Sequence, residues 1–194
     1  MGQIISNIKI LFNMLFYYNF SCSYIMPPYC INRRRRQCGG GSLMVHGCLM
    51  PNGLIFIKKI VGNQKAMYYT RLLKQFVVPC MNLNCETGFN FVQDNAPIHT
   101  AKETKVFLQQ QHFKTLCWPA NSPDLNPIEN VWKMISDLVY KEQQPHNSKE
   151  LEEKIDDAVN RINQYKRNVL KNLYVTFRTR LVDVLKLRGN LINH

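Results

Sequence analysis

Two carboxylates, Asp94 and Glu129, stand where a metal site could form. Asp94 ends a short, alternating, aromatic-rich run (residues 89–93) that predicts a strand. Glu129 follows Asn126-Pro127 and falls in the first turn of a predicted helix, and residues 95–128 separate the two acids. Carboxylates held close together bind Mg²⁺ or Mn²⁺, and two such ions about 3.5–4 Å apart can drive phosphodiester cleavage.

Each carboxylate also has a purely structural interpretation. Glu129 lies three residues after Asn126, where its side chain can reach back to a free backbone N–H and complement the helix dipole. Asp94 can form an Asx turn with the residues that follow it. Among isolated residues such structural roles are commoner than metal ligation, so the sequence around the two acids decides between them.

Strands alternate with helices around these residues, which predicts an α/β domain. Apolar runs at 42–49 and 54–61 flank Asn52-Gly53 and predict a β-hairpin, and residues 66–78 have helical apolar spacing that Pro79 should stop. The Thr100–Glu103 spacing predicts a capping box and a helix to about residue 111, with a strand at 113–117.

The second half of the chain is predicted to be mainly helical. After a proline-rich loop at 118–127, apolar residues recur with helical spacing from 128 to 139. A second helix is expected from Ser148 to about Ile162, and a third, basic helix from 169 to 185.

The charge of the chain is strongly basic and unevenly distributed. It has 25 Lys and Arg against 13 Asp and Glu, a formal net charge of +12, and a length of 194 residues that fits one domain. Glu86 is the only acid in residues 1–93. Two basic ends around an acidic middle fit a nucleic-acid channel with a carboxylate centre, although solvated helix faces produce similar counts.

The seven cysteines and the N-terminal segment bear on whether the protein is a zinc-binding, disulfide-bonded, secreted or membrane-spanning protein. No Cys-x-x-Cys pair occurs, which argues against a zinc ribbon or a disulfide scaffold and favours reduced thiols. Residues 10–20 are apolar and precede Ser21-Cys22-Ser23, as in a signal peptide, but Asn13 and Pro27-Pro28 oppose a membrane-spanning helix. One or two buried strands are an equally good interpretation.

Two long motifs resemble the catalytic core of the mariner superfamily of DNA transposases. They are Gln93-Asp94-Asn95-Ala96-Pro97-Ile98-His99-Thr100 and the segment from Trp118 to Trp132, WPANSPDLNPIENVW. The interval between Asp94 and Glu129 is the one usual in that superfamily. Gly39–Val45 is similar to its glycine-led second strand, with His46 where a Trp is usual, and Arg180–Gly189 is similar to its C-terminus.

The resemblance implies a DDE-type endonuclease with a ribonuclease-H-like mixed sheet flanked by helices. It implies a three-carboxylate site for Mg²⁺ or Mn²⁺ with Asp94 as the second ligand and Glu129 as the third, while Asn95 and His99 would shape the adjoining loop. It further implies cut-and-paste DNA transposition and integration, DNA as partner, whether transposon ends or non-specific, a homodimer and a nuclear location. No stable membrane association is expected.

The pattern breaks at the first carboxylate, which the family carries on its opening strand. If Lys9–Phe12 begins that strand, the acid should fall near Asn13 or Met14, and neither can replace it. Glu86 precedes the Asp94 strand and belongs to a different element. We therefore expect an atypical or missing first strand, an atypical segment at 1–32 and an incomplete catalytic domain at 33–190.

Three functions follow from these observations. The first is a transposase-derived domain with impaired cleavage, without the family's helix-turn-helix half and hence without specific recognition of transposon ends. The second is a non-catalytic DNA-binding protein that uses basic residues alone. Those residues are Arg33, Arg34, Arg35, Arg36, Arg178, Arg180, Lys186 and Arg188. The third, a signal-bearing secreted protein, rests on residues 1–23.

Overall fold

A computed structural model describes residues 9–14, 20–21, 42–61, 65–84, 89–116, 118, 125–141 and 145–186. Its strands form one mixed sheet: β1 (Lys9–Met14), β2 (Phe20–Ser21), β3 (Ser42–Leu49), β4 (Ile55–Ile60), β5 (Phe89–Val92) and β6 (Lys114–Thr115). β3 pairs antiparallel with β1, β2 and β4, whereas β1, β5 and β6 run parallel. The predicted α/β class is confirmed.

The N-terminal apolar run supplies strands of this sheet. β1 lies between β3 and β5 and carries no acid, so of the two expected alternatives the first strand is atypical and not missing. The segment that the sequence sets apart as 1–32 thus contributes to the same sheet as the rest of the chain. Among the described residues, no helix is both long enough and apolar enough to cross a bilayer.

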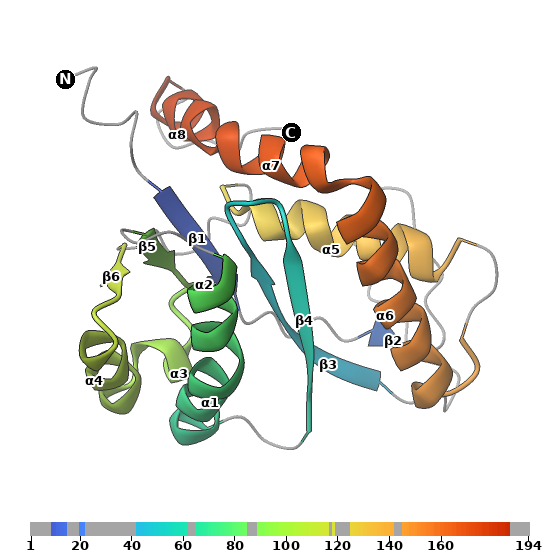
Figure 1. Ribbon diagram of the computed structural model, residues 1–194, viewed down its shortest axis with the longest axis horizontal. Helices are drawn as coiled ribbons and strands as arrows, with labels where there is room; N and C mark the ends of the chain where they lie inside the picture. The colour runs from blue at the N-terminus through green and yellow to red at the C-terminus, as the bar shows by residue number, and fades with distance from the viewer. Residues whose placement is uncertain are drawn as a thin grey trace.

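Helices cover both faces of the sheet (Figure 1). One side carries α1 (Ala66–Leu72), α2 (Val78–Asn84), α3 (Pro97–Thr100) and α4 (Lys102–Gln110), and the other α5 (Pro127–Val139), α6 (Ser148–Tyr165), α7 (Arg167–Val175) and α8 (Phe177–Lys186). In Figure 1, α1 and α4 lie to the left of β3 and β4, and α6 to their right.

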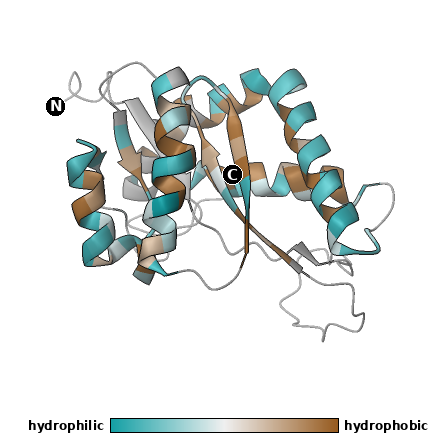
Figure 2. Cartoon of the chain, turned by 60° about the horizontal axis from the view of Figure 1, so that its bottom comes forward, coloured by the Kyte–Doolittle hydropathy of each residue, from teal (hydrophilic) through white to brown (hydrophobic). Residues whose placement is uncertain are grey.

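Two apolar cores result, one on each face of the sheet. Val45, Leu49 and Val92 pack with Trp132 of α5 in the first, whereas Phe91 joins residues of α1 and α4 in the second. Figure 2 shows the central strands mostly apolar and the surrounding helices banded polar and apolar. Successive strand residues point to opposite faces of the sheet, and each face is covered by its own layer of helices. Neighbouring residues of a strand are therefore both buried.

Three helix boundaries differ from the sequence-based expectation. Pro79 does not stop the first helix, because a π-helical turn η1 (Leu73–Val77) precedes it and re-registers the backbone bonds before α2 continues. Thr100 does not cap α4: its hydroxyl donates to the carbonyls of Ala96 and Pro97 within α3. The predicted third C-terminal helix is two helices, α7 and α8, that meet at Thr176.

Candidate active site

Asp94 lies two residues beyond the last residue of β5, the strand that neighbours β1. Its Oδ1 accepts a hydrogen bond from the Ala96 N–H at 2.9 Å, which is the expected Asx turn. The same oxygen lies 2.5 Å from Nδ1 of His99, a fully buried residue of α3. Burial by itself raises the pKa of Asp94, but the hydrogen bonds from His99 and Ala96 outweigh it, so the pKa lies below its usual value.

A further set of polar contacts holds the loop that carries Asp94. The Tyr69 hydroxyl of α1 donates to Oε1 of Gln93 at 2.8 Å, and Nε2 of Gln93 donates to the His99 carbonyl at 3.1 Å. The Tyr69 and His99 rings lie 4.5 Å apart. Sequence reasoning missed Tyr69, because its contacts with the loop join residues far apart in the chain.

His46 extends this buried group away from Asp94. Its ring lies 6.2 Å from that of Tyr69 and is fully buried, and burial lowers its pKa to about 3. Neither ring nitrogen has a hydrogen-bond partner among the described residues. His46 is therefore a neutral core residue of β3, at the position where the family usually has a Trp.

Glu129 lies in the first turn of α5. The Asn126 side chain caps this helix by accepting from the Ile128 N–H at 3.3 Å, and Pro127 occupies the first helical position, as the sequence predicts. Within the described ranges no hydrogen bond or ion pair satisfies the Glu129 carboxylate, and its burial raises its pKa to about 7. Among the described residues, therefore, nothing neutralises this half-buried carboxylate, whose hard oxygens can accept a divalent cation.

The described residues do not complete a metal site. β1, the neighbour of β5, has the sequence KILFNM and carries no acid. In the part of the chain that the structure describes, no three His, Cys, Asp or Glu side chains are grouped so that they could hold a metal ion. Asp94 and Glu129 are thus two candidate ligands without a third.

The aromatic residues Phe91, Trp118 and Trp132, in or beside the two motifs, contribute to the interior. Trp132 and Phe91 are buried, and Trp118 packs against the first core, where it stacks on Phe177 of α8 at 5.9 Å between ring centroids. Nδ2 of Asn95 donates to the Trp118 carbonyl at 2.8 Å. Asn95 therefore ties the Asp94 loop to the segment that precedes α5.

The basic residues predicted to contact DNA have different surroundings. Residues 33–36 and Arg188 lie outside the described residues, as does the side chain of Arg178. Lys186 is exposed and lies 3.8 Å from Asp183. Arg180 is only 4% exposed and its Nη1 donates to Oδ1 of Asn130 at 3.3 Å, so its described contact is with α5. Burial lowers the pKa of Arg180.

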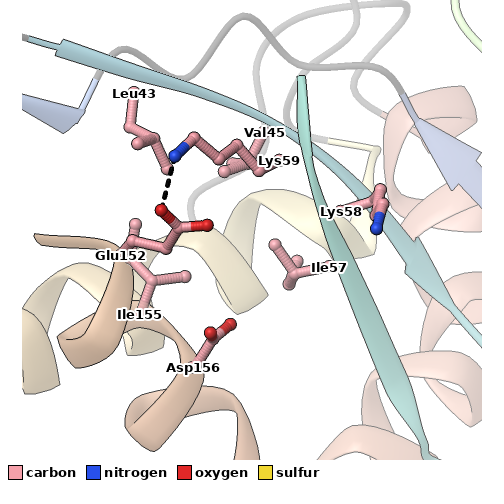
Figure 3. Close-up of a pocket in the computed structure, with 8 residues that line it drawn as sticks. All are labelled: Leu43, Val45, Ile57, Lys58, Lys59, Glu152, Ile155 and Asp156. Carbon is pink, nitrogen blue, oxygen red and sulfur yellow. Dashed lines mark hydrogen bonds and ion pairs between the residues drawn. The ribbon is translucent and has the colours of Figure 1, made fainter. Parts of the chain in front are cut away.

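A small pocket of about 140 Å³ lies between β4 and α6, away from both candidate ligands (Figure 3). Lys59 and Glu152 form an ion pair across it, and Ile57 and Ile155 line its apolar part. Lys58 and Asp156 also line the pocket. The pocket includes neither Asp94 nor Glu129 and is not part of the candidate active site.

Comparison with known proteins bears on both the family and the fold. A family described as DDE superfamily endonuclease matches residues 28–152. The chain is 32% identical over 161 residues to the Tc3 transposase of Caenorhabditis elegans, covering 82% of this chain and 48% of that protein. It is 37% identical over 95 residues to the Tc1 transposase of the same organism, covering 49% and 35%.

Solved structures share the fold at low identity. The Mos1 transposase paired-end complex with the left transposon end has a TM-score of 0.74 at 18% identity, covering 95% of this chain and 56% of that chain. The Mos1 catalytic domain has a TM-score of 0.68 at 15% identity, covering 95% and 84%. The present chain spans about half the length of the Tc3 transposase. It covers about a third of the Tc1 transposase. It belongs to the DDE endonuclease superfamily and has the ribonuclease-H-like catalytic domain of a mariner-superfamily transposase.

Proposed function

We propose that this chain is a transposase-derived domain that binds DNA and whose metal-dependent cleavage of DNA is impaired. The observation that carries the proposal is the absence of Asp and Glu from β1, the strand beside Asp94. Tc3 and Tc1 are transposases of transposable elements, which supports DNA transposition as the activity from which this domain derives.

The carboxylates that remain suit a divalent cation but do not fit a two-metal centre. Asp94 and Glu129 offer the hard oxygen ligands that Mg²⁺ and Mn²⁺ prefer, and structures of Mos1 complexes contain Mg or Mn. Two metal ions carry four positive charges, whereas these two side chains supply at most two negative ones. Loss of the third carboxylate removes both charge and geometry, so we expect at most trace cleavage.

A binding and cleavage assay on linear duplex DNA with Mg²⁺ or Mn²⁺ tests this proposal. The chain should bind the duplex with an affinity that falls as salt rises, and it should cut no faster than the Asp94→Asn variant. Robust cleavage that Asp94→Asn and Glu129→Gln both abolish would overturn the proposal that cleavage is impaired. Absence of any salt-dependent binding would overturn DNA as the partner.

A second candidate, non-catalytic DNA binding, is favoured by the charges of α1 and α4. Cations of these two helices and their boundaries are exposed and form no ion pair with the described residues: Lys65, Arg71, Lys74, Lys102 and Lys105. The α6 cations Lys149, Lys154 and Arg161 each have an acid four residues away. Unpaired cations are available for DNA phosphates, and chromosomal DNA as the partner implies a nuclear location.

Charge reversal tests whether the cations of α1 and α4 carry the DNA binding. Lys102→Glu with Lys105→Glu should weaken DNA binding and flatten its dependence on salt, because phosphate contacts are lost. The matched control, Lys149→Glu with Arg161→Glu, reverses two exposed α6 cations that already pair with Glu153 and Asp157. Under this candidate, binding also survives Asp94→Asn. Equal losses in the two reversals would show that net charge, rather than this face, sets the affinity.

A further inference from the structure

The register of β1 against β5 identifies the residue that stands level with Asp94. The two strands are parallel, and Phe12 pairs with Val92. Met14 lies two residues after Phe12, and Asp94 lies two residues after Val92. Met14 and Asp94 therefore occupy corresponding positions at the same ends of two neighbouring strands.

The antiparallel pairing with β3 shows which face of the sheet position 14 belongs to. Met14 pairs with Gly47, and Asn13 pairs with Cys48. A Cβ on Gly47 would lie 2.4 Å from the Trp132 ring, so Gly47 is in contact with α5. Cys48 belongs to the core under α1 and α4. Because directly paired residues share a face, position 14 is on the α5 side and position 13 on the other.

Neighbouring pairs in the sheet agree with this assignment. Phe12 pairs with Leu49 and Val92, which both belong to the α5 core. Leu11 pairs with Phe91, which belongs to the core under α1 and α4. The α5 side is also the side that carries Glu129.

We infer that position 14, occupied by Met, is the place at which this chain lacks a metal-binding carboxylate, and that Asp at this one position would complete a site with Asp94 and Glu129. A methionine thioether is a soft ligand that does not suit Mg²⁺ or Mn²⁺. Of the other two candidate ligands, Asp94 has its Oδ1 held by Ala96 and His99, and Glu129 has no partner among the described residues. The inference rests on the proposed function.

Mn²⁺ binding by three full-length proteins tests the inference without relying on activity. The proteins are the wild type, Met14→Asp and the control Asn13→Asp, which adds the same charge one residue away on the opposite face. Free Mn²⁺ is followed by electron paramagnetic resonance during titration. Met14→Asp should bind Mn²⁺ roughly tenfold or more tightly than the wild type, because affinity rises with the number of charged ligands. Asn13→Asp should bind Mn²⁺ as weakly as the wild type.

Further variants keep the test decisive. Adding Glu129→Gln to Met14→Asp should return Mn²⁺ binding to the wild-type level. Met14→Asn, a neutral variant of nearly the same size, controls for folding, and Met14→Glu is the second acidic variant if Met14→Asp unfolds. Equal tightening by Asn13→Asp, or no tightening in a folded acidic variant at position 14, would overturn the inference. Salt-dependent DNA binding by the wild type is measured separately. Failure of the proposed function can therefore be told apart from failure of the inference about position 14.

Discussion

Replacing Glu129 with Gln is expected to stabilise the chain at neutral and higher pH. Burial in the first turn of α5 raises the pKa of Glu129 from 4.5 to about 7. The folded state therefore holds this proton more tightly than the unfolded state. Stability from this group is fully present below pH 4.5 and is lost as the pH rises from 4.5 to about 7. Gln cannot ionise, so the variant avoids that loss.

The magnitude follows from the same pKa. At about 1.4 kcal/mol per pKa unit, the rise from 4.5 to about 7 sets a ceiling of about 3.5 kcal/mol. Two effects reduce it: Glu129 is only half-buried, so water screens its charge, and an acid in the first helical turn gains about 0.3–1 kcal/mol from the helix dipole. We expect a net gain of about 1–2 kcal/mol at pH 8, or roughly 2–8 °C in Tm.

Urea unfolding of wild type and Glu129→Gln between pH 4 and pH 9 measures the effect. The two free energies of unfolding should agree near pH 4, separate as the pH rises from 4.5 to about 7, and stay separated above pH 7. Asp137→Asn is the control, because Asp137 is an exposed acid of the same helix. A Glu129→Gln variant that is less stable than the wild type at pH 8 would refute the account of Glu129 as a half-buried carboxylate whose charge no described residue neutralises.

Three further substitutions test the packing and the hydrogen bonds of the site. Gly47→Ala should cost about 1–3 kcal/mol in urea unfolding, because its Cβ would lie 2.4 Å from Trp132; an unchanged stability would mean that α5 can move away freely. His99→Ala should raise the pKa of Asp94, measured by carbon-13 NMR titration of its carboxyl, because burial would then lack its main counterweight; an unchanged pKa contradicts this. Asn126→Ala should cost about 1 kcal/mol by removing the α5 cap, and a loss below a few tenths would show that the cap is redundant.

Local sequence was enough to place the two acids. The Asx turn of Asp94 and the Asn126-Pro127 start of α5 depend on residues within a few positions of each other, and both occur as predicted. The π-helical turn before Pro79 was missed, because it depends on how the whole helix packs against the sheet.

Contacts between distant residues were not predictable in the same way. An uncharged apolar run at the N-terminus has the composition of a signal peptide and of a buried strand alike, and only the pairing of β1 with β3 and β5 distinguishes them. The same holds for Tyr69 on Gln93 and for Arg180 on Asn130, which lie 24 and 50 residues apart in the chain.

The central proposal is that this domain has two of three metal ligands, Asp94 and Glu129, and therefore cuts DNA at most at a trace level. Nicking of supercoiled plasmid by the purified wild-type chain in Mn²⁺, measured beside Asp94→Asn, tests it most directly. The account predicts equal, background-level nicking rates for the two proteins. Wild-type nicking well above background that Asp94→Asn removes would contradict it.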